Sequence, residues 1–89
     1  MKNFYKMERL VRGFSNHRRI EMMELLKKSP ELSLDEVATI LNINFKTASE
    51  HMRRLAIAGI VIKRSERNNV RHKLTQVGIS ILKFLRTLE

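Results

Sequence analysis

Residues 33–74 read SLDEVATILNINFKTASEHMRRLAIAGIVIKRSERNNVRHKL, and they contain the clearest structural signals in the chain. Ser33 followed by an acidic first turn is a capping-box pattern, which indicates the start of a short helix. Asn42 and Asn44 enclose a tight turn, because asparagine tolerates the left-handed backbone conformation and also caps helices. Ile43, the apolar residue between them, is expected to fill the angle between two helices. The pattern therefore predicts two helices joined by this turn.

The second of these helices is expected over about residues 45–58, and Gly59 ends it. At about 100° per residue, Ala48, Met52 and Leu55 fall within a narrow arc that forms a buried face. Polar and charged residues occupy the opposite side of the helix. The helix is thus expected to lie on the body of the protein and to present a polar surface outward.

A β-hairpin is expected directly after this helix. β-Branched residues indicate strands at 60–62 and 70–74, and a polar loop at 65–69 joins them. We call residues 60–74 the wing. Its basic residues could bind phosphates or enter a minor groove, although charges on an exposed hairpin also deter aggregation.

Three further helices are expected on either side of this region. The first spans about Asn3–Gly13, and the second spans about Asn16–Lys28 with Ser15 as its N-cap. Thr75 caps the last helix, whose wide apolar stripe suggests a partner helix. The stripe consists of Val77, Ile81, Leu82, Leu85 and Leu88. The expected fold is mainly α with a small β-hairpin: a winged helix-turn-helix of about five helices and a two- or three-stranded wing.

The charge of the chain is strongly unbalanced. Its 89 residues, enough for one domain, include 18 Lys and Arg against 9 Asp and Glu, a net charge of +9. Residues 46–74 hold eight of the basic residues, whereas residues 29–45 hold none. This distribution favours a polyanionic partner, with nucleic acid first and an anionic membrane surface second. A basic domain that is merely soluble is the alternative.

Several classes of protein are disfavoured by what the sequence lacks. Without cysteine there are no disulfides, thiolate metal sites or cysteine nucleophiles, which fits a reducing interior. The charged first residues are unlike a signal peptide, and no apolar run is long enough to span a bilayer. No paired carboxylates, Ser/His/Asp arrangement or Gly-rich phosphate loop has supporting context, which argues against an enzyme. We therefore expect a cytoplasmic, non-enzymatic protein.

The three histidines do not indicate a metal site. His17, His51 and His72 are scattered, whereas a metal needs convergent ligands. His51 is expected to pack against the core or a backbone carbonyl, and His72 is expected on a wing strand. We expect neither a metal nor a cofactor.

The outward face of the 45–58 helix and the wing carry the candidate DNA-contacting residues. Side chains near the start of this helix suit base edges, and arginines farther along suit phosphates. The alternative is an ordinary solvated face, because Lys46–Glu50 and Glu50–Arg54 are i,i+4 pairs that steady any exposed helix. The candidates are Asn44, Lys46, Thr47, Ser49, Glu50, Arg53 and Arg54 around the helix, and Lys63, Arg64, Arg67, Asn68, Asn69 and Arg71 on the wing.

Five segments carry a resemblance to a known family. They are residues 14–20 (FSNHRRI), 32–38 (LSLDEVA), 47–55 (TASEHMRRL), 58–61 (AGIV) and 74–78 (LTQVG). With its Ser-x-His-Met-x-x-Leu and Ala-Gly-Ile-Val motifs, the sequence resembles the ArsR-type winged helix family and, more distantly, MarR-type regulators. The likeness covers nearly the whole chain.

This resemblance implies a homodimeric transcriptional regulator whose recognition helix, about residues 44–58, enters the major groove of double-stranded DNA. The first and last helices of the family, here within residues 1–14 and 75–89, usually pair the protomers. Metal sensors of the family carry cysteines where this chain has Ser33 and Asp35, and the last helix has no histidine for the other common metal site. The resemblance therefore implies neither a metal nor any known effector.

The sequence thus predicts a homodimeric, sequence-specific DNA-binding regulator that acts as a repressor. Two other functions remain open. The same fold could present its helix to a protein partner, which is favoured by Ile57 on the outward line of Lys46, Glu50 and Arg53. Alternatively, the basic wing could bind structured RNA without specific readout of DNA.

Overall fold

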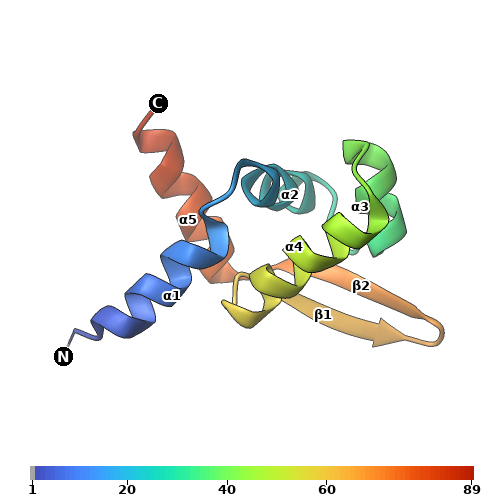
Figure 1. Cartoon of the computed structure of the whole chain (residues 1–89), viewed down its shortest axis with the longest axis horizontal. Coiled ribbons are helices and arrows are strands. Elements are labelled where there is room, and N and C mark those ends of the chain that lie inside the picture. Colours follow the sequence, from blue (N-terminus) through green and yellow to red (C-terminus); the bar gives the residue numbers. More distant parts are fainter. Residues whose placement is uncertain (1) are drawn as a thin grey trace.

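The computed structural model describes residues 2–89 and shows five helices and one antiparallel hairpin (Figure 1). The elements in chain order are α1 (Phe4–Phe14), α2 (His17–Lys28), α3 (Leu34–Leu41), α4 (Phe45–Ile57), β1 (Val61–Glu66), β2 (Asn69–Leu74) and α5 (Gln76–Thr87). The predicted fold is confirmed: α3 and α4 form the helix-turn-helix, and β1 and β2 form the wing. None of the helices in this described part of the chain is long and apolar enough to cross a membrane.

The predicted N-cap of α2 is wrong by one residue. Asn16, not Ser15, caps the helix, and its side chain accepts hydrogen bonds from the backbone N–H groups of Arg18 and Arg19 at 2.9 and 3.2 Å. Ser15 instead lies at the C-terminal end of α1. Both residue types are good caps, so local propensity did not separate the two positions.

The predicted capping box at the start of α3 and the predicted turn between α3 and α4 are both present. The Ser33 hydroxyl accepts a hydrogen bond from the Glu36 N–H at 3.2 Å, and the Glu36 carboxylate accepts one from the Ser33 N–H at 2.9 Å, which completes the capping box. Asn42 adopts the left-handed conformation with φ of 53°. The Asn44 side chain accepts two hydrogen bonds from the first turn of α4. Local hydrogen bonding therefore sets where both helices begin.

The hairpin is longer and its turn is tighter than the sequence predicts. The sequence predicts a loop at residues 65–69, but Ser65 pairs with Val70 and Glu66 pairs with Asn69. Only two residues remain in the turn, and the first of them, Arg67, has a φ of 55°. Two-residue hairpin turns usually place glycine or asparagine at such a position. The tight turn was missed because an arginine takes that place.

The linker between α2 and α3 pairs with the edge of β2. The Leu32 carbonyl accepts hydrogen bonds from the His72 backbone N–H at 3.0 Å and from the His72 ring Nδ1 at 2.9 Å. The Glu31 N–H donates to the His72 carbonyl at 2.9 Å. This isolated bridge joins the wing to the segment that leads into α3. The wing thus has two strands and one bridge.

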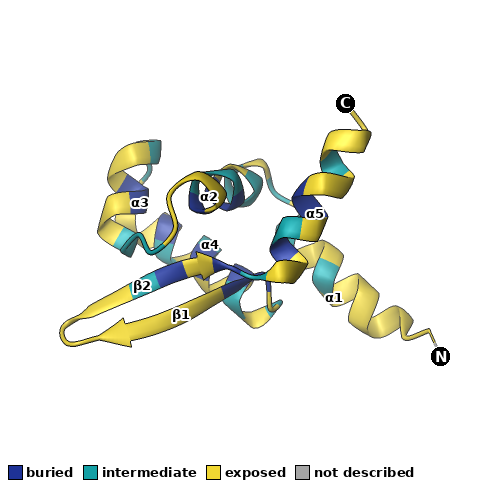
Figure 2. Cartoon of the chain, turned by 180° about the vertical axis from the view of Figure 1, so that it is seen from behind, coloured by how far each residue is buried: buried dark blue, intermediate teal, exposed yellow. Residues whose placement is uncertain are grey.

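The core forms around α2, which lies at the centre of the fold (Figure 1). Buried side chains come from α2, α3, α4, the junction between α4 and β1, both strands and α5. They are Met22, Met23, Leu26, Val37, Met52, Leu55, Ile60, Val61, Leu74, Ile81 and Leu82. Figure 2 shows most of α1 and the far half of the wing exposed. These exposed parts lie at opposite ends of the molecule.

Two glycines allow close packing around the segment that joins α4 to the wing. A Cβ atom at Gly78 would lie 2.5 Å from Leu74 Cδ1 and 2.8 Å from the Ile60 carbonyl oxygen. At Gly13 it would lie 2.4 Å from the Ala58 Cβ. The α5 and α1 backbones therefore approach this segment more closely than any larger residue would permit.

Gly78→Ala is expected to destabilise the protein by about 1–3 kcal/mol, because the added methyl group must displace a buried leucine and a backbone carbonyl. The free energy of unfolding in urea measures this effect. Ser80→Ala, at an exposed position of the same helix, is the matched control and should change stability little. Equal stabilities of the two variants would contradict the close packing of α5.

The buried His72 ring makes stability depend on pH. Burial lowers the pKa of His72, with the hydrogen bond to the Leu32 carbonyl opposing the shift and Lys63 adding to it. Below an ordinary histidine pKa of about 6.5, the unfolded chain binds a proton that the folded chain does not. The free energy of unfolding should therefore fall as the pH drops from about 7.5 to 5. Burial and the positive charge of Arg19 lower the pKa of His51 as well, with Glu50 opposing them, so His51 contributes in the same direction.

We expect His72→Gln to lose less stability over this pH interval than the wild-type protein does, since the variant lacks that titrating ring. Urea unfolding at both pH values measures the difference. His17→Gln, which replaces an exposed ring, is the control. A pH-dependent loss in His72→Gln as large as in wild type would show that His72 is not the source.

Candidate nucleic-acid interface

The helix α4 lies next to the wing (Figure 1), and its exposed face is polar. Its inner side is buried through Ala48, Met52 and Leu55, as predicted. The candidate residues Asn44, Lys46, Thr47, Glu50, Arg53 and Arg54 are exposed. Ser49 is half-buried and lies at the edge of this face. The structure thus brings the predicted helix residues together on one side of the molecule.

Glu50 organises the two arginines of α4. Its carboxylate accepts hydrogen bonds from Arg53 Nη2 at 2.9 Å and Nε at 3.3 Å, and it lies 3.3 Å from Arg54 Nε. The bond from Arg53 is the main reason that the pKa of Glu50 is below its ordinary value. With both carboxylate oxygens engaged, Glu50 aligns the arginines on the helix surface. Lys46 makes no ion pair within residues 2–89.

The tip of the wing projects into solvent. Lys63, Arg67, Asn68 and Asn69 are exposed, and Figure 2 shows that the surface around the turn has no buried residue. Within the described part of the chain, the Lys63 and Arg67 side chains form no ion pair. These two cations are available to an incoming anion.

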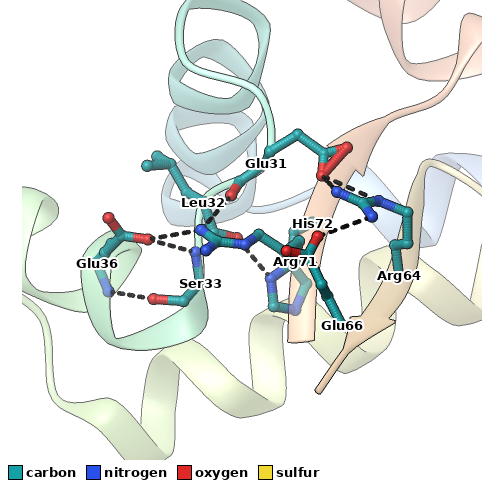
Figure 3. A network of polar contacts seen from close by, with 8 residues as sticks. All are labelled: Glu31, Leu32, Ser33, Glu36, Arg64, Glu66, Arg71 and His72. Atoms are coloured by element: carbon teal, nitrogen blue, oxygen red, sulfur yellow. Dashed lines mark hydrogen bonds and ion pairs between the residues drawn. The ribbon is translucent and has the colours of Figure 1, made fainter. Parts of the chain in front are cut away.

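Arg64 and Arg71, in contrast, are bound to other residues of the protein (Figure 3). Arg64 donates to Glu31 from Nε at 3.1 Å and from Nη2 at 2.5 Å, and its Nη1 donates to Glu66 at 3.0 Å. Arg71 Nη1 donates to the Glu31 carbonyl at 3.2 Å and lies 3.8 Å from the Glu36 carboxylate. Sequence reasoning grouped all the wing arginines together and missed this division.

His51 connects α4 to α2. Its Nδ1 lies 3.3 Å from Arg19 Nη1, and Arg19 Nη2 donates to the Arg12 carbonyl. Partial burial and the positive charge of Arg19 lower the pKa of His51. The expected packing of His51 against the body of the protein is confirmed, but its polar partner is a guanidinium rather than a backbone carbonyl.

Apolar residues beside the polar face were not among the candidates. Phe45, the first residue of α4, is 53% exposed, and Ile40 near the end of α3 is also exposed. An apolar side chain in this position can contact a thymine methyl group in the major groove. The exposure of Phe45 could not be read from periodicity, because its angular position is close to that of the buried Ala48 and Met52.

A second exposed surface combines α1 and α5 at the end of the molecule opposite the wing tip (Figures 1 and 2). Its exposed apolar residues are Phe4, Tyr5, Met7, Val11, Val77, Phe84 and Leu88. The predicted stripe on α5 is only partly available, because Ile81 and Leu82 are buried in the protomer's own core. Ile57 borders a groove of about 770 Å³ between α1, the end of α4 and the start of α5.

The described residues contain no cluster of three or more histidine and acidic side chains that could hold a metal ion. His51 and His72 each have a structural partner within the protein.

Comparison with known proteins shows the family to which the chain belongs. The model of the bacterial regulatory protein arsR family matches residues 16–63. No protein with a curated description matches the sequence. The match to the arsR family spans α2 to the start of β1, which includes the whole helix-turn-helix.

Solved structures share the fold over nearly the full chain. HlyU from Vibrio cholerae is 27% identical with a TM-score of 0.82, and the match covers 98% of this chain and 95% of that one. The transcriptional regulator HlyU from Vibrio vulnificus is 28% identical with a TM-score of 0.77, covering 97% and 90%. The homodimeric winged helix-turn-helix DNA-binding domain of Mb0332 from Mycobacterium bovis is 24% identical with a TM-score of 0.82, covering 96% and 78%. Because the family match includes more than half of the 89 residues, the chain belongs to the arsR family of bacterial regulatory proteins.

Proposed function

We propose that the protein is a homodimeric, sequence-specific DNA-binding regulator that acts as a repressor. The observation that carries this proposal is the polar face of α4, exposed next to a wing whose Lys63 (on β1) and Arg67 (in the turn) make no ion pair among residues 2–89. An α-helix fits the major groove, and a wing beside it reaches the flanking backbone or minor groove. Membership of a family of regulatory proteins supports the proposal.

The α4 residues divide into two roles in this proposal. Lys46, Thr47 and Ser49 lie in the first two turns and contact base edges, with Glu50 beside them. Arg53 and Arg54 lie farther along the helix and bind phosphates. On the wing, Lys63, Arg67, Asn68 and Asn69 reach the DNA.

The apolar surface of α1 and α5 supports the proposal of a second copy at this end of the molecule. Exposed apolar side chains of this number are costly in water, and a second copy would cover them. The Mb0332 domain, which has the same fold, is homodimeric. Two-fold symmetry then requires a near-palindromic operator with half-sites about 34–36 Å apart. The protein acts from the cytoplasm, where it meets DNA.

DNA binding is expected to depend strongly on salt. A dimer that neutralises about 6–10 phosphates should lose about 10³–10⁵ in affinity between about 50 and 200 mM salt. Fluorescence anisotropy with fragments selected from random DNA measures this slope. An affinity that does not change over the interval would contradict the proposal, and preferential competition by duplex RNA would favour an RNA-binding function instead.

Substitutions on α4 and on the wing should have different effects. Thr47→Ala and Ser49→Ala are expected to change which sequence is preferred, because these side chains contact bases. Arg67→Ala should weaken binding to all sequences and reduce the salt slope by about 0.9 for each phosphate that the variant no longer neutralises. Repeating the selection with each variant separates the two roles. If all three variants affect preferred and scrambled duplexes equally, the protein binds DNA without reading its sequence.

The oligomeric state can be tested on α1. Val11→Glu is expected to shift the protein toward monomer in sedimentation, because a dimer would have to bury an unpaired carboxylate. Ile40→Glu is the matched control, since the exposed fractions are similar, 52% for Val11 and 56% for Ile40, and α3 lies outside the α1–α5 surface. Identical sedimentation of the two variants and wild type would contradict dimerisation through α1.

A further inference from the structure

Two arginines face each other across the wing. In the register of the hairpin, Arg64 of β1 is paired directly with Arg71 of β2. Like charges at directly opposed positions of an antiparallel pair repel each other. Three carboxylates surround them, from Glu31, Glu66 and Glu36 (Figure 3). Only Glu66 belongs to the wing. Of the other two acids, Glu31 lies in the linker before α3 and Glu36 lies in α3.

Glu31 occupies the central position in this arrangement. Its carboxylate accepts two hydrogen bonds from Arg64, while its carbonyl accepts one from Arg71. The main chain of Glu31 is fixed in a left-handed conformation, with a φ of 71°, and its N–H is bonded to the His72 carbonyl. Arg64 also holds the pKa of Glu31 below its ordinary value, so the carboxylate is charged at neutral pH. One residue of the linker thus holds the guanidinium of β1.

The Glu31 carboxylate is not needed to attach the wing. The backbone bonds of Glu31 and Leu32 to His72 already join the linker to β2. Moreover, the side chains of Arg64 and Glu31 are 54% and 36% exposed, and ion pairs exposed to this extent contribute little to stability. The main effect of the carboxylate is therefore on charge: it neutralises Arg64 and keeps its guanidinium on the body of the protein.

We propose that Glu31 is a specificity-determining residue, which withholds Arg64 from the phosphate backbone of DNA. This inference rests on the proposed function. Phosphate contacts add affinity for every sequence alike, whereas base contacts discriminate. By neutralising a wing cation, Glu31 lowers the affinity for non-specific DNA and leaves the base contacts of α4 unchanged. The wing cations Lys63, Arg67 and Lys73 have no ion-pair partner among residues 2–89, and they remain as phosphate ligands.

The test measures the salt slope and the affinity ratio between preferred and scrambled duplexes for full-length variants. Glu31→Gln leaves Arg64 with Glu66 as its one remaining acidic partner, so its slope on the scrambled duplex should steepen by up to about 0.9, the value for one more neutralised phosphate per engaged protomer. The affinity ratio should fall. Arg64→Gln alone should leave the slope near that of wild type, because Arg64 is already neutralised. The double variant Glu31→Gln/Arg64→Gln should return to the wild-type slope.

Two controls separate this effect from net charge and from folding. Asp35→Asn removes an exposed carboxylate that makes no ion pair within the described chain, so it should steepen the slope less than Glu31→Gln does. Glu31→Asn repeats the test with a residue that tolerates the left-handed backbone. It provides the measurement if glutamine at this position impairs folding.

Three results would overturn the inference. The slope of Glu31→Gln could equal that of wild type or of Asp35→Asn, or Glu31→Gln could bind both duplexes more weakly, as expected if Glu31 positioned the wing. A steeper slope that persists in the double variant would exclude Arg64 as its cause. If the wild-type protein binds no duplex at low salt, the proposed function itself fails. Binding by wild type with an unchanged slope in Glu31→Gln refutes only the role of Glu31.

Discussion

The Leu32 carbonyl accepts two hydrogen bonds from His72, one from the backbone N–H and one from the ring. This contact joins the linker before α3 to β2, and so it joins the helix-turn-helix to the wing. The ring is buried, and a hydrogen bond in such a site is strong because water cannot compete for it. The relative position of α4 and the wing depends on this short ladder. The Arg64–Glu31 and Arg71–Glu36 ion pairs, and the core that α4 shares with both strands, add to this ladder.

Acidic residues divide the basic surface into two groups of cations. Glu50 aligns Arg53 and Arg54 along α4, and Glu31 holds Arg64 against the body of the protein. Lys46, Lys63 and Arg67 form no ion pair in the described residues. The total of 18 Lys and Arg residues therefore overstates how many cations are free to bind an anion. Nearly all these pairs are exposed, so they affect where charge lies more than they affect stability.

Much of the candidate site could be predicted because its causes are local. The polar face of α4 follows from helical periodicity, and Ser33 and Asn44 cap their helices through neighbours within three residues. Where two causes competed locally, the prediction was less accurate. The N-cap of α2 is Asn16 rather than the predicted Ser15, and the hairpin turn contains Arg67 at a position where glycine is usual. Phe45 is exposed because α4 extends beyond the core at its first turn, which periodicity does not describe.

The sequence alone determined four features of this protein: the helix starts, the buried face of α4, the fold class and the excess of positive charge. Each of them arises from short-range hydrogen bonding, periodicity or composition. The sequence did not determine which wing arginines are paired with acidic residues. Glu31 and Arg64 are far apart in the chain, and only the pairing of the α2–α3 linker with β2 brings them together. Likewise, only packing showed that Ile81 and Leu82 of the α5 stripe belong to the core while Val77, Phe84 and Leu88 remain exposed. Contacts between distant segments, and the burial they create, are properties of the folded chain.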